Sequence, residues 1–137
     1  MTETRITKKV FLRASPQQVW AYLTEPDKLE RWFHVPKAPL TEGPMAMYGA
    51  QSGDKLIWGD VLEAQPFSKL VYTFTVKPMG DATSTVTWTW RDVAGGTELS
   101  LLQEGLAQDD DSFGLVLALD KGWDDHLGRM RADMHAD

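Results

Sequence analysis

One short stretch near the N-terminus fixes two consecutive helices. Ser15 can cap a helix, Pro16 suits its first position, and Gln18 stands where a capping box places Glu or Gln. The residue before a proline disfavours the α conformation, so this first helix ends just before Pro26. A second short helix is predicted from about Pro26 to Trp32. We therefore expect two consecutive short helices after the first strand.

Alternating apolar and polar residues predict a sheet in the middle of the chain. Residues 85–90 alternate strictly, which places Val86, Trp88 and Trp90 on one face and three threonines on the other. The face that carries the indoles must be covered by another element. Around Gly59, apolar residues occupy both the odd and the even positions, so the inward face of this strand is not defined by the pattern. We expect a bulge at Gly59. The predicted strands span about residues 5–13, 44–51, 54–63, 67–77, 83–92 and 96–105.

A long helix is predicted over about residues 112–132, where apolar side chains recur every three or four positions. Asp120 interrupts this apolar stripe. Gly122 in the helix interior should cost about 0.5 to 1 kcal/mol relative to alanine, so we expect it to let the helix approach another element closely. The acidic run Asp109–Asp111 suits the positive end of the helix dipole and is expected to cap the helix.

Further landmarks follow the paired helices in a fixed order. They are Gly59-Asp60-Val61-Leu62-Glu63, the segment 66–74, Gly95-Gly96-Thr97-Glu98-Leu99, and Gly122-Trp123. In order and spacing they resemble the SRPBCC or START-like superfamily, in the branch named after the C-terminal domain of the activator of Hsp90 ATPase. The resemblance covers nearly the whole chain.

The resemblance implies an α+β helix-grip fold. A curved antiparallel sheet of about six strands would wrap round the long C-terminal helix, with two short helices after the first strand. Relatives carry small apolar or amphipathic ligands in the gap between sheet and helix. Some perform cyclase or hydratase chemistry there. We therefore look for a site on the inward face of the sheet.

Composition narrows the partners that this chain can have. The chain has 137 residues, of which 42% are hydrophobic. We therefore expect residues 1–137 to form one domain with a hydrophobic core. A net charge of -6 disfavours broad contact with nucleic acid or a stable association with anionic membranes. The absence of cysteine excludes disulfides and thiol catalysis. Because no apolar run of signal-peptide length precedes Arg13, a cytoplasmic location is expected.

The candidate ligand-binding residues combine aromatic area with a few polar groups. Aromatic side chains supply large contact area, and methionines adapt to varied occupants. Gln103 is expected to point inward, like the apolar residues two and four positions before it in the same strand. The family often shows histidine at this position. A glutamine can orient a ligand, but it transfers protons poorly. Packing in the core is the alternative role for each. The candidates are Trp32, Phe33, Met45, Met47, Tyr72, Phe74, Trp88, Trp90, Gln103, Leu117 and Asp120.

Two residues are candidates for acid–base chemistry. Asp120 on the apolar stripe either faces a wet cavity, pairs with a cation or turns to solvent, because an unpaired buried carboxylate is costly. His34 follows the aromatic pair and can reach the cavity mouth, whereas His126 is expected on an exposed flank. There is no phosphate-binding loop, nucleophile elbow or HExxH motif. The leading hypothesis is a protein that binds a small hydrophobic, aromatic or lipid-like molecule between the sheet and the long C-terminal helix, without cofactor or metal. A cyclase or hydratase acting on a polyketide-like or aromatic substrate is the alternative.

A third hypothesis is a protein-interaction role, which the name of the branch suggests. The activator proteins carry an additional N-terminal domain that this sequence lacks. Stimulation of Hsp90 would therefore rest on fold analogy alone, and it is not expected here.

Overall fold

The computed structural model describes residues 4–79, 82–106 and 112–136. The predicted cap Asp109–Asp111 lies outside these residues. Its elements, in chain order, are β1 (Ile6–Leu12), α1 (Pro16–Thr24), α2 (Pro26–Trp32), β2 (Val35–Pro36), β3 (Gly43–Tyr48), β4 (Lys55–Gln65), β5 (Lys69–Val76), the 3-10 helix η1 (Lys77–Met79), β6 (Ser84–Val93), β7 (Gly96–Glu104) and α3 (Phe113–His135).

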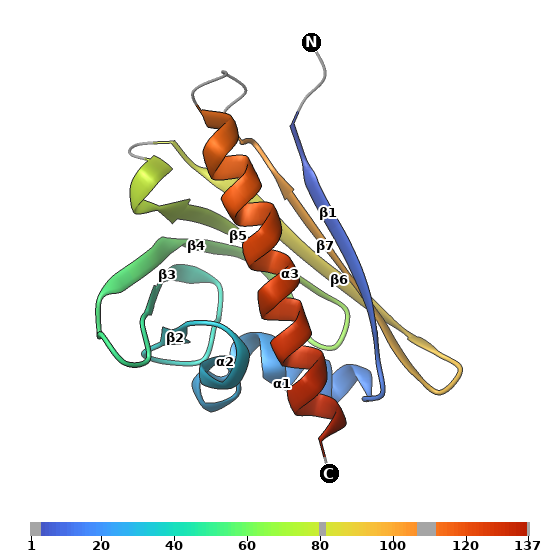
Figure 1. The fold of residues 1–137 in the computed structure, drawn as a ribbon. Coiled ribbons are helices and arrows are strands. Elements are labelled where there is room, and N and C mark those ends of the chain that lie inside the picture. The colour runs from blue at the N-terminus through green and yellow to red at the C-terminus, as the bar shows by residue number, and fades with distance from the viewer. Residues whose placement is uncertain (1–3, 80–81, 107–111, 137) are drawn as a thin grey trace.

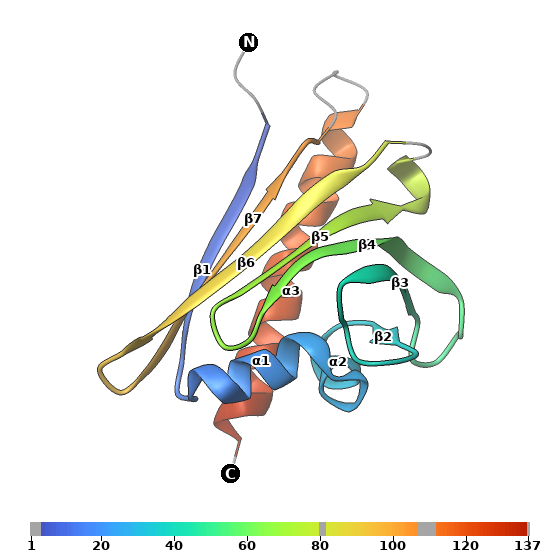
Figure 2. The same ribbon diagram turned by 180° about the vertical axis from the view of Figure 1, so that it is seen from behind.

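The strands form one antiparallel sheet that curves around α3. The strand order is β1-β7-β6-β5-β4-β3-β2. Figure 1 shows α3 crossing one face of the sheet, and Figure 2 shows α1 and α2 together at the end where α3 finishes. The predicted helix-grip fold is confirmed. The sheet has seven strands rather than about six, because the two-residue β2 pairs with β3.

The first helix begins as the sequence predicts. Ser15 Oγ accepts a hydrogen bond from the Gln18 backbone N–H at 3.1 Å, and Gln18 Oε1 accepts one from the Ser15 N–H at 2.8 Å. This reciprocal capping box satisfies two backbone donors that would otherwise lack partners. The chain therefore turns sharply from β1 into α1.

The irregularity in β4 lies two residues beyond the predicted position. The register between β4 and β5 shifts between Val61 and Glu63; Gly59 pairs with Met45 of β3 but has no partner in the β4–β5 register. A Cβ at Gly59 would stand 2.3 Å from the Thr73 carbonyl oxygen. The glycine therefore allows a close approach between two strands, and the bulge that follows it adds to the curvature of the sheet.

Three ridges of α3 face three different surroundings, as a helix of 3.6 residues per turn allows. Trp123, Leu127 and Met130 are buried against the sheet and α2. Asp120 and Asp124 face β1, where both carboxylates contact Lys8 Nζ, at 2.7 and 2.9 Å. Gly122 and His126 make up a third ridge, which is half-buried.

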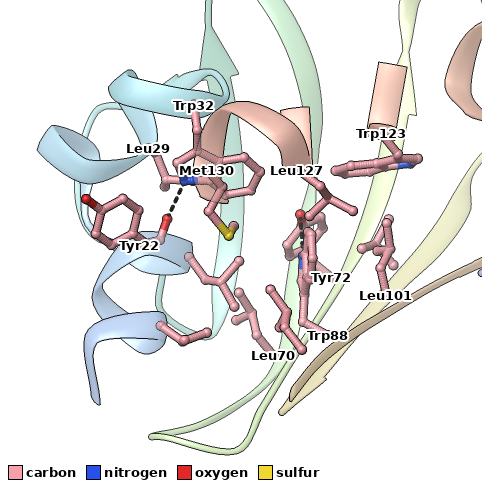
Figure 3. Packing of buried hydrophobic residues seen from close by; sticks show 14 of the residues in the cluster. Tyr22, Leu29, Trp32, Leu70, Tyr72, Trp88, Leu101, Trp123, Leu127 and Met130 are labelled. Atoms are coloured by element: carbon pink, nitrogen blue, oxygen red, sulfur yellow. Dashed lines mark hydrogen bonds between the residues drawn. The ribbon is translucent and has the colours of Figure 1, made fainter. Parts of the chain in front are cut away.

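The buried aromatic residues are held by specific hydrogen bonds as well as by packing. Trp88 Nε1 donates to Tyr72 Oη at 3.0 Å, and Trp32 Nε1 donates to the Tyr22 carbonyl at 2.8 Å; Figure 3 shows both. Trp90 Nε1 donates to the carbonyl of Pro16 in α1. No buried side-chain nitrogen or oxygen lacks a partner among the described residues. The core is therefore fixed in orientation, which gives the neighbouring site rigid walls.

Candidate functional site

A cavity of about 720 Å³ lies between α3 and the ends of β4 and β5. This volume is within the usual range of small-molecule sites. The two residues after α2, the residue before β4, and β4, β5, η1 and α3 all contribute to its walls. They are Phe33, His34, Asp54, Lys55, Leu56, Ile57, Phe74, Val76, Lys77, Pro78, Ala118, Leu119, Gly122, Trp123 and His126.

One wall of the cavity is a stack of aromatic rings. The Phe33 ring stacks against Trp32, with ring centroids 5.0 Å apart, and against Trp123, with ring centroids 5.3 Å apart. Phe74 contributes from β5, at 5.9 Å from Trp123. Phe33 is the C-cap residue of α2, so the end of this helix positions the stack. Offset and edge contacts of this kind stabilise one another beyond simple burial.

The Trp123 indole is held from below by a buried amide. Gln103 is fully buried, and its Oε1 accepts a hydrogen bond from Trp123 Nε1 at 2.8 Å. The Gln103 amide nitrogen donates to Ser84 Oγ at 2.9 Å, and this hydroxyl donates to the Phe74 carbonyl. Gln103 therefore positions the Trp123 indole in the cavity wall, because both polar atoms of its amide form hydrogen bonds within the protein.

Gly122 leaves space at the cavity rather than allowing a close approach. No other element lies within 4 Å of the position that a Cβ would take there. The expectation of a tight contact at this glycine is therefore wrong. Gly122 lines the cavity beside Trp123, so the missing side chain enlarges the space in front of the indole.

Two histidines form the polar part of the aromatic wall. The His34 and His126 rings are 5.3 Å apart, edge to face, and both line the cavity. His126 Nδ1 lies 3.0 Å from the Trp32 carbonyl oxygen and 2.6 Å from a guanidinium nitrogen of Arg129. A neutral Nδ1 either donates to the carbonyl or accepts from Arg129, so each tautomer satisfies one of these contacts. His126 is half-buried, contrary to the expected exposed flank.

Both imidazoles are neutral at physiological pH. Burial lowers the pKa of His126 to about 4, against the raising effect of the Trp32 carbonyl. Burial also lowers the pKa of His34, and the Arg129 guanidinium lowers it further. The cavity therefore presents uncharged ring nitrogens that can donate or accept a hydrogen bond.

We expect the free energy of unfolding to decrease as the pH falls from about 6.5 to about 4. In this window an unfolded histidine binds a proton, whereas His126 with its lowered pKa does not, so acid favours the unfolded chain. After discounting for partial exposure, the loss is on the order of 2 kcal/mol. Urea unfolding at closely spaced pH values measures it.

His126→Gln is the matched variant for this pH series, because its amide can still donate to the Trp32 carbonyl but does not titrate. The dependence on pH should flatten in the variant, leaving the smaller contribution of His34. Glu98 and Asp125, whose carboxyl pKa values are lowered by Arg91 and Lys121, lose their contributions at still lower pH. An unchanged slope in His126→Gln would contradict the assignment.

The structure distributes the sequence-predicted site residues over three environments. Phe33, Phe74 and His34 line the cavity. Five others lie in the buried core: Trp32, Met47, Tyr72, Trp88 and Gln103. Of these, Trp32, Trp88 and Gln103 contact the lining residues Phe33 or Trp123 directly.

The remaining candidates lie away from this cavity. Met45 lines a separate hollow beside β3, and Trp90 packs against Trp20 of α1. Leu117 is 56% exposed on α3. Asp120 pairs with Lys8 on the β1 side of the helix. Its carboxylate therefore belongs to an ion pair rather than to the cavity lining.

Several lining residues carried no distinguishing signal in the sequence. Trp123 follows the same apolar stripe as Leu127, so helical spacing predicts burial for both and does not reveal which one borders open space. Lys55 and Lys77 lie at the ends of predicted strands, as ordinary surface lysines do. Gly122 beside Trp123 was the available hint, since a helical glycine requires some reason.

The described residues hold no group of three or more His, Cys, Asp or Glu side chains that could bind a metal ion. Within the same ranges, no helix has the length and apolar character needed to cross a membrane.

The fold has close structural relatives. A Mesorhizobium loti protein, MLL2253, superposes with a TM-score of 0.81 at 22% identity, covering 94% of this chain and 95% of its own. CV1439 from Chromobacterium violaceum gives a TM-score of 0.74 at 25% identity, covering 97% and 98%. DynU16, from the dynemicin biosynthetic locus, gives 0.80 at 23% identity, with 96% of this chain and 47% of that one aligned.

Sequence comparison agrees with the structural likeness. No curated protein matches the chain significantly. The family model described as activator of Hsp90 ATPase homolog 1-like protein matches residues 13–134, which extend from before α1 to the last turn of α3. The chain therefore belongs to the activator of Hsp90 ATPase homolog 1-like family.

Proposed function

We propose that this protein binds a small aromatic or otherwise apolar molecule, without covalent chemistry, in the cavity between α3 and the sheet. The observation that carries the proposal is the cavity itself, about 720 Å³ in volume, beside the Phe33–Trp123 stack. A planar ligand placed there extends an existing series of rings. The rigid core behind the stack keeps the ordering cost of binding low.

The size of the cavity sets the scale of affinity. Removing about 250 Å² of apolar ligand surface from water, at about 25 cal/mol per Å², contributes about 6 kcal/mol. Association also costs translational and rotational freedom, so this transfer term sets an upper limit on affinity, a Kd on the order of 10–100 µM for a two-ring compound. The location of the relative DynU16 in the dynemicin biosynthetic locus adds a small-molecule context for one protein of this fold.

Acid–base catalysis is the second candidate function, because the imidazoles of His34 and His126 reach the cavity. Burial lowers the pKa of both rings, and a base with a pKa of about 4 has little driving force to abstract a proton at pH 7. The other candidate, Asp120, is engaged by Lys8 outside the cavity. Binding therefore stands ahead of catalysis.

An NMR titration tests the binding proposal. We expect a panel of naphthalene derivatives, flavonoids, fatty acids and sterols to contain compounds that saturably shift the Trp123 indole N–H signal. Trp20 and Trp90 pack together at the α1 side and serve as internal controls that should shift little. Well-dispersed indole signals that stay fixed at millimolar concentrations of every compound would contradict the proposal.

A further inference from the structure

We infer that the ligand of this cavity carries an anionic group, held at the end formed by β4 and η1; this inference rests on the proposed function. The residues that line the cavity include two lysines, Lys55 and Lys77, and one acidic residue, Asp54. The two histidines of the lining are neutral near pH 7, because burial lowers the pKa of both. The rim is thus positive in a chain whose net charge is -6.

The register of the sheet brings the two lysines together. Ile57 of β4 pairs with Val76 of β5, and both residues line the cavity. Lys55 lies two residues before Ile57, and Lys77 directly follows Val76. In an antiparallel pair these positions lie at the same end of the ladder. Both lysines therefore lie where β4 begins and β5 passes into η1, with the Lys55 Nζ over the Trp58 ring, while Phe33 and Trp123 reach the cavity from the end of α2 and from α3.

Lys77 differs from the other lysines of the protein in its surroundings. Carboxylates lie within 4 Å of four lysines: Lys8, Lys9, Lys69 and Lys121. Three others lie over aromatic rings: Lys28, Lys37 and Lys55. Lys77 has neither kind of partner among the described residues. An unpaired ammonium at the rim of an apolar cavity is a ready site for a carboxylate, phenolate or sulfonate.

The aromatic residues and the lysines of the cavity lining together define the class of ligand. Fused rings fit against Phe33 and Trp123, while an acidic substituent reaches Lys77 and Lys55. Asp54 at the same rim opposes a second negative charge, so a monoanion is favoured over a dianion. The geometry points to a planar aromatic acid with its charge at one end.

A pair of nearly isosteric probes tests this inference. 1-Naphthalenesulfonate is anionic at pH 7, and 1-naphthalenesulfonamide is neutral. At about 20 mM salt we expect the sulfonate to bind about five-fold more tightly, and the difference to shrink at about 500 mM salt. Shifts of the Trp123 indole signal report both affinities.

Lysine variants assign the charge effect to its source. Lys77→Gln should remove most of the preference for the sulfonate and leave sulfonamide binding unchanged. Lys28→Gln, which alters a lysine on α2 outside the cavity lining, should change neither. Persistence of the full preference in the Lys55→Gln, Lys77→Gln double variant would overturn the inference.

The two proposals fail in different ways. Equal binding of both probes overturns the anionic-ligand inference and leaves the binding function standing. If neither probe nor any other compound of the panel shifts the Trp123 signal, the proposed function itself fails.

Discussion

Gln103→Met is expected to destabilise the protein by about 3 kcal/mol. Methionine approximates the shape of glutamine but cannot accept the Trp123 N–H or donate to Ser84 Oγ. Both partners are buried: the Trp123 N–H would lose its acceptor, and Ser84 Oγ would lose a donor while it still donates to the Phe74 carbonyl, in a region of low dielectric constant. Urea denaturation followed by tryptophan fluorescence measures the loss.

The control for this substitution is Gln51→Met, at an exposed glutamine between β3 and β4. The change in side chain is identical, and the expected effect is below about 0.5 kcal/mol. A loss in Gln103→Met as small as in the control would mean that the Gln103 hydrogen bonds do not stabilise the core. Hydrogen exchange at the Trp123 indole N–H gives a second readout, because this hydrogen should exchange with solvent faster in the variant.

Gly122→Leu is expected to weaken binding of the tightest naphthalene ligand at least ten-fold without unfolding the protein. The new side chain would enter the cavity beside Trp123, where no other element lies within 4 Å of the Cβ position. A ligand and the leucine would then compete for the same space. Replacing a helical glycine should also stabilise α3 by about 0.5 to 1 kcal/mol.

Gly128→Leu separates the helix effect from the cavity effect. Gly128 is a second α3 glycine with open space at its Cβ position, but it is exposed and lies outside the cavity lining. We expect a similar gain in stability and unchanged affinity. Loss of binding in both variants would point to the flexibility of α3, and retained binding in Gly122→Leu would place the ligand elsewhere.

Much of the fold was predictable because local signals agreed with one another. The capping box at Ser15 and the alternation of residues 85–90 each specify their element from nearby residues. The two-residue β2 was missed, since Val35 and Pro36 are too few to show a period. The position of the β4 bulge was also missed, because it depends on how β5 aligns with β4 across the sheet.

The cavity was less predictable than the sheet around it. Periodicity identifies inward-facing residues, but a wall and a packed core are lined by the same residue types. Trp88 and Trp123 have comparable sequence signals, yet Trp123 lines the cavity and Trp88 packs behind it. Likewise, a helical glycine can admit a neighbour or leave a void, and the sequence does not distinguish the two at Gly122.

Two of the ridges of α3 differ in what a mutation on them would change. Mutations on the ridge of Trp123, Leu127 and Met130 change how the helix is anchored. Those at Gly122 change the volume that a ligand meets and touch no neighbouring element. Under the proposed binding function, a substitution at Gly122 would change the size of ligand that fits while leaving the anchoring of the helix unchanged.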